Sequence, residues 1–198
     1  TGGSYTEFHK PHFYNNITFG SKWIEKGLEM ADYISVKKKT TLRKFKNPLN
    51  IIRIGLFDIW VENTDRKPTN NNILFSASES HLIINAIDHA FTFDSVKYAD
   101  LNAKYVNNTY NENILETSLA KEIISLKIKK SDKSEWVDGL KEYFYLCTNK
   151  CKQNFDTIVR YIPEELGFDR DLSRHIYDFL FNDNRNKKVY SEFLSRIL

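Results

Sequence analysis

The stretch FDIWVENTDRKPTNNNILF, residues 57–75, decides the fold and holds most of the candidate chemistry. Its first part completes an apolar run that begins at Leu49 and stops at Asn63, which is long enough for a buried helix. A polar loop with a central Pro68 follows, and a short apolar run then begins at 73–77. The stretch therefore predicts a buried helix that leads into a polar loop and then into a strand.

A second short apolar run, 81–88, follows the first after the small polar turn 78–80. Two such runs joined by a polar turn are typical of a β-hairpin. Asp65 and Asn70 lie five residues apart in the loop before the hairpin, and Asp88 lies at the end of its second predicted strand. We therefore expect the hairpin to carry Asp88 back toward the loop.

These three side chains have the chemistry that phosphoryl transfer requires. The reaction needs a carboxylate near the attacking hydroxyl, and oxygen ligands that hold Mg²⁺ against the phosphates. Mg²⁺ takes one or two carboxylates together with phosphate oxygens and water, rather than a cage made of protein alone. The pattern predicts Asp65 for the first role, and Asn70 with Asp88 for the second. The alternative is an Asx-rich loop that caps a helix and a turn, because Asn and Asp are common in such turns.

The segment FDIWVENTDRKPTNNNIL, followed by IDHAF at 87–91, resembles the signature of the HipA-like kinases, which are related to the phosphatidylinositol-type kinases. Three further segments are loosely similar to that family: ITFGSKWIE (17–25), IPEEL (162–166) and DFLFNDNR (178–185). The resemblance implies a protein-kinase-like C-terminal lobe in which a small β-hairpin carries the metal-binding Asp. It also implies that ATP and Mg²⁺ are the cofactors.

Residue by residue, the resemblance implies a catalytic loop that contains Asp65, Arg66 and Lys67. Asp65 is then the catalytic carboxylate, and Arg66 occupies a position that supports the loop. Asn70 and Asp88 become the ligands of the metal, and through the metal they bind the nucleotide.

The sequence departs from the family pattern at two positions and is ambiguous at a third. Lys67 stands where a His usually braces the loop, and Glu62 stands where a small residue usually precedes Asn63. A lysine at position 67 has the alternative of contacting phosphate. The triple Asn at 70–72 leaves open which amide is the metal ligand.

Beyond residue 114 the sequence pattern is helical. Apolar residues recur at helical spacing from Leu115 to Leu126, and again from Ser134 up to Pro163. Two more amphipathic helices are expected at 173–181 and 189–198.

The first half of the chain gives weaker signals. Residues 22–36 have a weak helical pattern, and the polar segment 94–113 predicts a long loop. We expect an α+β fold, mostly α-helical, that forms one lobe over residues 1–198. It divides into an irregular segment, 1–21, a catalytic-loop and hairpin region, 22–113, and a helical bundle, 114–198.

Composition restricts the class of protein. The chain has 198 residues, and its 29 Lys and Arg against 26 Asp and Glu give a net charge of only +3, which argues against a dedicated nucleic-acid binder. Two cysteines, Cys147 and Cys151, are typical of a reducing compartment. No apolar run of about 18 residues or secretory signal is present. We therefore expect a cytoplasmic protein without a membrane span.

The expected function is ATP- and Mg²⁺-dependent phosphorylation of a Ser or Thr on a protein substrate. No Gly-rich phosphate loop and no strand Lys precede residue 57. Either an N-terminal lobe supplies them, upstream or on a partner chain, or such a lobe was never present. One alternative is a catalytically inactive, pseudokinase-like interaction module. A weaker one is nucleic-acid binding through the run 37–46, which carries six positive charges.

Overall fold

The computed structural model describes residues 24–36, 42–89, 91–95, 97–107, 112–130, 133–163, 165 and 168–198. Within these ranges the helices are α2 (Met30–Val36), α3 (Asn50–Trp60), α4 (Ser118–Lys130), α5 (Lys133–Arg160), α6 (Arg170–Leu180) and α7 (Asp183–Ile197). The strands are β1 (Leu28–Glu29), β2 (Ile73–Ser78) and β3 (His81–Ala86). Short 3-10 helices are η2 (Leu42–Lys44), η3 (Thr92–Ser95), η4 (Tyr98–Asp100) and η6 (Ile114–Glu116). The described part is thus mostly helical with a small sheet, which confirms the α+β prediction.

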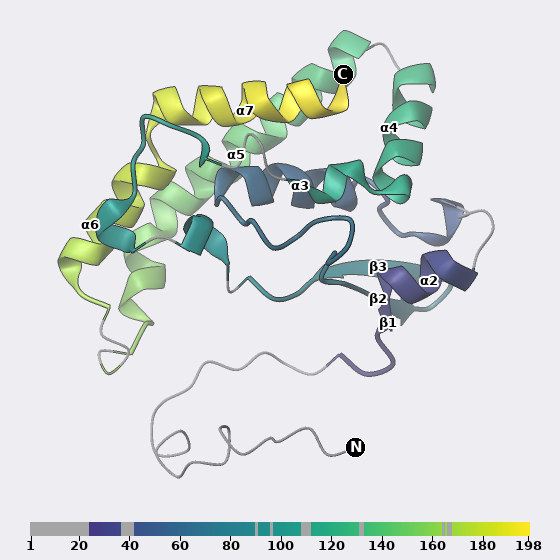
Figure 1. The fold of residues 1–198 in the computed structure, drawn as a ribbon, viewed down its shortest axis with the longest axis horizontal. Coiled ribbons are helices and arrows are strands. Elements are labelled where there is room, and N and C mark those ends of the chain that lie inside the picture. Colours follow the sequence, from purple (N-terminus) through teal and green to yellow (C-terminus); the bar gives the residue numbers. More distant parts are fainter. Residues whose placement is uncertain are drawn as a thin grey trace.

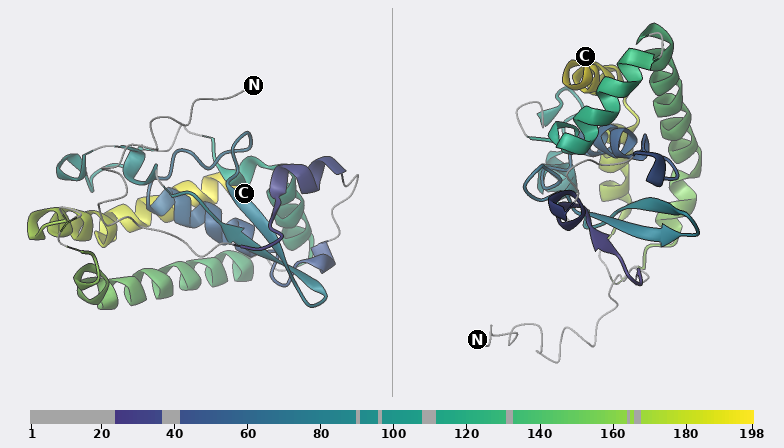
Figure 2. Two further views of the ribbon diagram at one scale, coloured as in Figure 1. Left: turned by 90° about the horizontal axis from the view of Figure 1, so that it is seen from below. Right: turned by 90° about the vertical axis from the view of Figure 1, so that its right-hand side faces the viewer.

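Helix α3 lies at the centre of the molecule, between the sheet and the long helices α5 and α7 (Figures 1 and 2). Its buried residues are mainly aliphatic, as the apolar run predicted. At its C-terminal end the indole N–H of Trp60 donates a hydrogen bond of 3.0 Å to the carbonyl oxygen of Leu180. The ring of Trp60 also meets the ring of Phe144 at 6.4 Å between centroids. The end of α3 that leads into the candidate site is therefore fixed by both α5 and α6.

Gly55 lets the chain pack closely against the middle of α3. A Cβ at this position would lie 2.5 Å from Cγ of Leu115, which belongs to η6. The carbonyl oxygen of Gly55 also accepts a hydrogen bond from Nδ2 of Asn113 at 3.5 Å. Only a residue without a side chain allows this contact, so the glycine is a packing requirement rather than a weak point of the helix.

The sheet is antiparallel with the strand order β1-β2-β3. The hairpin pairs Ser78 with His81 at the turn and Ile73 with Ala86 at the far end, which confirms the predicted hairpin. Strand β1 pairs Leu28 with Phe75, so part of the segment expected to be helical over 22–36 is instead an edge strand. The helix begins only at Met30. The weak apolar pattern of this segment could not distinguish a strand from a helix, because β1 is defined by its pairing with β2.

Other boundaries also differ from those expected. Helix α7 begins at Asp183, where the side chain of Asn182 accepts a hydrogen bond from the main-chain N–H of Arg185 at 2.9 Å. The first turns of α7 are polar, so apolar spacing did not reveal them. The expected loop 94–113 contains η4, and Asp88 lies just beyond β3 rather than within it. The irregular segment 1–21 lies outside the described residues, as do residues 37–41 of the basic run 37–46.

In the described part of the chain, no helix has the length and apolar character needed to cross a bilayer.

Candidate functional site

The carboxylate of Asp65 lies at the centre of the loop that follows α3. Its Oδ2 accepts two hydrogen bonds, from Nδ2 of Asn70 at 2.8 Å and from Nδ2 of Asn72 at 2.9 Å. Asp65 and Asn70, predicted from their spacing, are therefore brought into direct contact. Asn72 is a third member that the sequence left undecided.

The loop is closed by main-chain bonds that do not depend on the side chain at position 67. The N–H of Lys67 donates to the carbonyl oxygen of Asn70 at 3.0 Å, and the N–H of Asn70 donates back to that of Lys67 at 3.0 Å. The main-chain N–H of Asp65 donates to Oδ1 of Asn63 at 3.3 Å. The replacement of the usual His by Lys67 therefore leaves the closure of the loop intact.

Arg66 is the buried support of this loop, and its side chain is fully enclosed. Its Nε donates a hydrogen bond to Oδ1 of Asp58 in α3 at 3.2 Å, and it lies 3.0 Å from Oδ2 of the same carboxylate as an ion pair. One of its two terminal nitrogens, Nη1, shares its N–H groups among three main-chain carbonyl oxygens, those of Asn71, Asn72 and Ile87. One guanidinium therefore joins the helix, the start of β2 and the residue before Asp88. Because it is enclosed, Arg66 acts on the site through these groups and not by contact with a substrate.

Asp58 was not singled out from the sequence, although it lies within the motif. Its side chain is buried and also accepts a hydrogen bond from Nδ2 of Asn63 at 3.0 Å. Burial raises the pKa of Asp58 to about 6, although the nearby charge of Arg66 and the hydrogen bond from Asn63 lower it. Desolvation therefore outweighs the ion pair at this carboxyl. The signal that could have revealed it was a carboxylate inside an otherwise apolar helix, since buried charges are paired.

Asp88 lies beside the loop because the end of the hairpin is held there. The N–H of Ile87 donates to the carbonyl oxygen of Asn72 at 3.0 Å, which places Asp88 next to the start of β2. Asn72 and Asp88 both adopt positive φ, at 46° and 51°. Asn and Asp are the non-glycine residues that tolerate this conformation best. The residue types at positions 72 and 88 thus suit the positive φ that the backbone adopts just before β2 and just after β3.

His89 follows Asp88 and packs against α3. Its ring meets Phe57 at 5.9 Å between centroids, in an edge-to-face arrangement. Burial and the charge of Arg66 both lower the pKa of His89, while Asp88 raises it. The environment therefore favours a neutral imidazole at this position.

The chain beyond Asp88 is tied to the turn between α3 and the loop. Main-chain N–H groups of Phe93 and Asp94 donate to the carbonyl oxygens of Val61 and Glu62, at 2.7 Å and 2.9 Å. The Glu62 carboxylate accepts a hydrogen bond from Nη2 of Arg185 at 3.0 Å and one from the main-chain N–H of Asn107 at 3.1 Å.

The side chains of Glu62 and Arg185 are both fully buried. Glu62, the departure from the family pattern, therefore has a specific partner on α7. That partner is far away in the sequence and was not predicted.

A cavity of about 210 Å³ lies against this loop. Its wall is formed by residues 69–74 and Ile87 on one side, and by Glu29 and Ala31 of the β1–α2 junction on the other. The cavity therefore provides space for a ligand directly beside the two amides that contact Asp65.

The side chains present fit Mg²⁺. Asn70 and Asn72 use their nitrogens on Asp65, so the amide oxygens are the atoms left to act as ligands. Together with the carboxylate of Asp88, they are hard oxygen donors of the kind that Mg²⁺ prefers. Among the residues that the structure describes, no three His, Cys, Asp or Glu side chains gather to hold a metal ion by themselves. A site completed by phosphate oxygens needs no such cluster.

Comparison with known proteins agrees with the resemblance of the motif. No curated protein and no solved structure matches the chain. A sequence model of the family described as HipA-like kinase matches residues 6–188, which is most of the chain. The match includes the loop, the hairpin and the helices that hold them, so the chain belongs to the HipA-like kinase family.

Proposed function

We propose that this chain transfers the γ-phosphoryl group of ATP to a Ser or Thr hydroxyl of a protein substrate, with Mg²⁺ as cofactor. The observation that carries the proposal is the contact of the Asp65 carboxylate with the side-chain amides of Asn70 and Asn72. The buried Arg66 stabilises this loop and donates to the carbonyl oxygen of Ile87, the residue before Asp88. Family membership supports kinase activity in general, and this arrangement supports the roles proposed for its residues.

In this proposal Asp65 orients the attacking hydroxyl and accepts its proton. The two amide hydrogen bonds go to Oδ2, which fixes the plane of the carboxylate and directs Oδ1 for the hydroxyl. A base held in one orientation is what proton transfer at the moment of attack requires.

Asn70 and Asp88 hold the cation, and Asn72 is the second amide available to it. When bound, Mg²⁺ neutralises charge on the phosphate oxygens and aligns them for in-line transfer. The cavity beside residues 69–74 has room for part of a nucleotide. We propose that a basic side chain and a covering loop for the phosphates come from an N-terminal lobe or a partner chain.

The test combines nucleotide binding with phosphoryl transfer in the full-length protein. Asp88→Asn should weaken binding of Mg²⁺-ATP, measured by calorimetry, and leave binding of ATP in EDTA unchanged. Asp65→Asn should keep Mg²⁺-ATP binding and lose transfer to a library of Ser- and Thr-containing peptides by about 10³-fold or more. Transfer at the wild-type rate in either variant would falsify the assignment of that residue.

The same measurements separate the proposal from a catalytically inactive interaction module. Such a module should show no Mg²⁺-dependent ATP binding and no transfer with the native residues in place. The closure of the loop at Lys67 and Asn70 favours the active enzyme, because the main-chain hydrogen bonds form with Lys67 in place of the usual His.

A further inference from the structure

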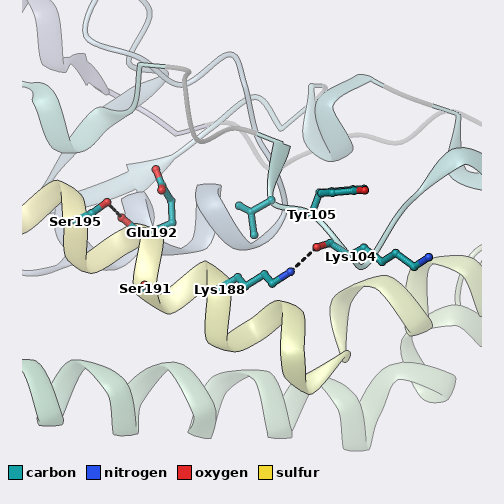
Figure 3. Close-up of a pocket in the computed structure, with 7 residues that line it drawn as sticks. Lys104, Tyr105, Lys188, Ser191, Glu192 and Ser195 are labelled. Atoms are coloured by element: carbon teal, nitrogen blue, oxygen red, sulfur yellow. Dashed lines mark hydrogen bonds between the residues drawn. The ribbon is translucent and has the colours of Figure 1, made fainter.

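A groove of about 390 Å³ lies between helix α7 and residues 104–106 (Figure 3). Within it, Nζ of Lys188 donates to the carbonyl oxygen of Lys104 at 2.7 Å, and the hydroxyl of Ser195 donates to the main-chain oxygen of Glu192 at 2.7 Å. These bonds are internal to the chain, so the groove does not by itself identify a ligand. A smaller cavity elsewhere does, because both cysteines line it.

This smaller cavity, of about 140 Å³, lies between α3 and α5. Four apolar side chains form much of its wall: Leu56, Phe57, Trp60 and Phe144. Cys147 and Cys151, both on α5, line the same cavity. They are free thiols, and each is only partly exposed. We propose that the two sulfur atoms bind one Cu(I) ion in this cavity.

The spacing of the two cysteines suits a single bridging atom. Cys147 and Cys151 are four residues apart within α5. Residues at this spacing lie on one face of a helix, with about 5–6 Å between their Cβ atoms. A disulfide needs Cβ atoms about 3.5–4.5 Å apart, so the helix would have to distort to form one. Two metal–sulfur bonds of about 2.3 Å span about 4.6 Å between the sulfurs, which the regular helix allows.

The number of donors selects the metal. Thiolates are soft ligands that favour Cu(I), Zn²⁺ and iron–sulfur clusters. Structural zinc sites and iron–sulfur clusters take four protein ligands. Among the described residues, no third His, Cys, Asp or Glu side chain joins the two cysteines. Thr148 lines the cavity too, but its hydroxyl donates to the main-chain oxygen of Tyr145 at 3.2 Å. Two thiolates alone suit Cu(I), which forms linear complexes with two sulfur ligands.

The cavity wall also suits the charge of such a complex. When both thiols release their protons, one Cu(I) and two thiolates carry a net charge of −1, and the copper keeps its oxidation state. Arg53 lines the cavity, and its guanidinium lies 4.2 Å from the ring centroid of Tyr143. Within the described part of the chain, the enclosed Nε of Arg53 has no hydrogen-bond partner. The anionic complex therefore meets a positive charge that is already in the wall.

Without metal, the environment keeps the thiols protonated. Burial raises the pKa of Cys151, and the neighbouring Cys147 raises it further. A protonated thiol is a poor nucleophile, which argues against a catalytic or redox role for the pair. Because Cu(I) must displace both protons, its affinity should increase as the pH rises. The apolar side chains around the sulfurs limit the access of solvent to the bound ion.

The test measures Cu(I) binding without nucleotide, so its result does not depend on the proposed kinase reaction. The full chain, reduced and free of oxygen, competes for Cu(I) with the coloured chelator bicinchoninate. The wild type should remove one Cu(I) per chain, and the ion should raise its melting temperature. Cys147→Ser and Cys151→Ser should each weaken binding by about 100-fold or more, because loss of even an outer-shell partner costs about 10–100-fold.

A matched control keeps two thiols but changes their spacing. Cys151→Ser with Asn149→Cys introduces the second thiol at an exposed position of α5, two residues from Cys147. Residues two apart on a helix do not face each other, so this variant should bind Cu(I) no better than Cys151→Ser alone. Wild-type affinity in any of the three cysteine variants, or failure of the folded wild type to take Cu(I) from the chelator, would overturn the proposal.

Discussion

The Nε of Arg66 lies 3.0 Å from Oδ2 of Asp58, and neither side chain is exposed to solvent. This pair connects the central helix to the candidate catalytic loop. The same guanidinium also donates to the carbonyl oxygens of Asn72, just before β2, and Ile87, just after β3. It therefore fixes the position of the open end of the hairpin.

Replacing Arg66 should damage both stability and nucleotide binding. Arg66→Met leaves the Asp58 carboxyl buried without its partner, so the free energy of unfolding at pH 7 should fall by about 3–5 kcal/mol. The double variant Asp58→Leu with Arg66→Met should recover part of that loss, because an apolar pair can replace a buried ion pair. It should not recover Mg²⁺-ATP binding, since three carbonyls still lack their donor. Urea unfolding and calorimetry measure the two effects, and a single variant as stable as wild type would contradict this account.

The raised pKa of Asp58 gives a dependence of stability on pH. The folded-state pKa is about 6 and the ordinary value is 3.8, so the folded protein holds this proton more tightly than the unfolded chain does. The stability contributed by Asp58 is therefore complete below pH about 4 and is lost as the pH rises through about 6. Relative to Asp58→Asn, the wild type should lose stability across this window with a slope of at most about 1.4 kcal/mol per pH unit. Parallel stability curves for the two proteins would show that Asp58 does not titrate as described.

The buried pair of Glu62 and Arg185 should show strong coupling in a double-mutant cycle. Glu62→Gln and Arg185→Met should each lower the free energy of unfolding by about 3–5 kcal/mol, because each leaves the other charge buried and unpaired. The double variant should lose clearly less than the sum of the two. A matched control is Arg174→Ala on α6, where the Arg174–Asp178 contact is 3.9 Å long and 82% and 69% exposed, so its cost should be below about 0.5 kcal/mol. Additive losses at Glu62 and Arg185 would argue against a direct pair.

Two helical glycines should respond in opposite ways to alanine. Gly55→Ala places a methyl group 2.5 Å from Cγ of Leu115, so overpacking should lower the free energy of unfolding by about 1–3 kcal/mol despite the better helix propensity. At Gly139, in α5, nothing lies within 4 Å of an added Cβ. Gly139→Ala should therefore raise stability by up to about 1 kcal/mol. Thermal and urea unfolding of the two variants provide the comparison, and the same sign of change in both would be inconsistent with the packing described.

The two amides that contact Asp65 should be separable by substitution. Asn70 is exposed, so Asn70→Ala should change stability by less than about 0.5 kcal/mol and act mainly on Mg²⁺-ATP affinity. Asn72 has φ of 46° and is partly buried, so Asn72→Ala should lower stability by about 1 kcal/mol or more, since alanine disfavours that backbone. Mg²⁺ titrations of both variants show which amide oxygen the cation uses. If Asn70→Ala keeps the full Mg²⁺ affinity, the metal ligand is the amide oxygen of Asn72 instead.

The sequence was informative where the signal is local. The apolar run before Asn63 predicted α3, and the turn at 78–80 predicted the hairpin. The spacing of Asp65 and Asn70 identified two side chains that the structure brings into contact. Strand β1 was missed because a strand of two residues is defined by its pairing with β2. A period of apolar residues cannot report such a pairing.

The supporting residues of the site were harder to predict for the same reason. Glu62 and Arg185 are 123 residues apart, and neither belongs to an apolar pattern. Asp58 lies inside the motif, but its importance depends on burial, which only packing reveals. The sequence therefore indicated the residues proposed for the reaction better than those that hold them.

The position of Arg66 has a consequence for how the site forms and fails. Its contacts with Asn72 and Ile87 exist only while β2 and β3 are paired, because those residues lie at the open end of the hairpin. We therefore expect the hairpin and the candidate site to open together before the contacts that hold α5, α6 and α7 together are lost. On warming, such an opening disperses Asp65, Asn70 and Asp88 while the helices stay folded. Loss of nucleotide binding should then come at a lower temperature than loss of the helical circular-dichroism signal.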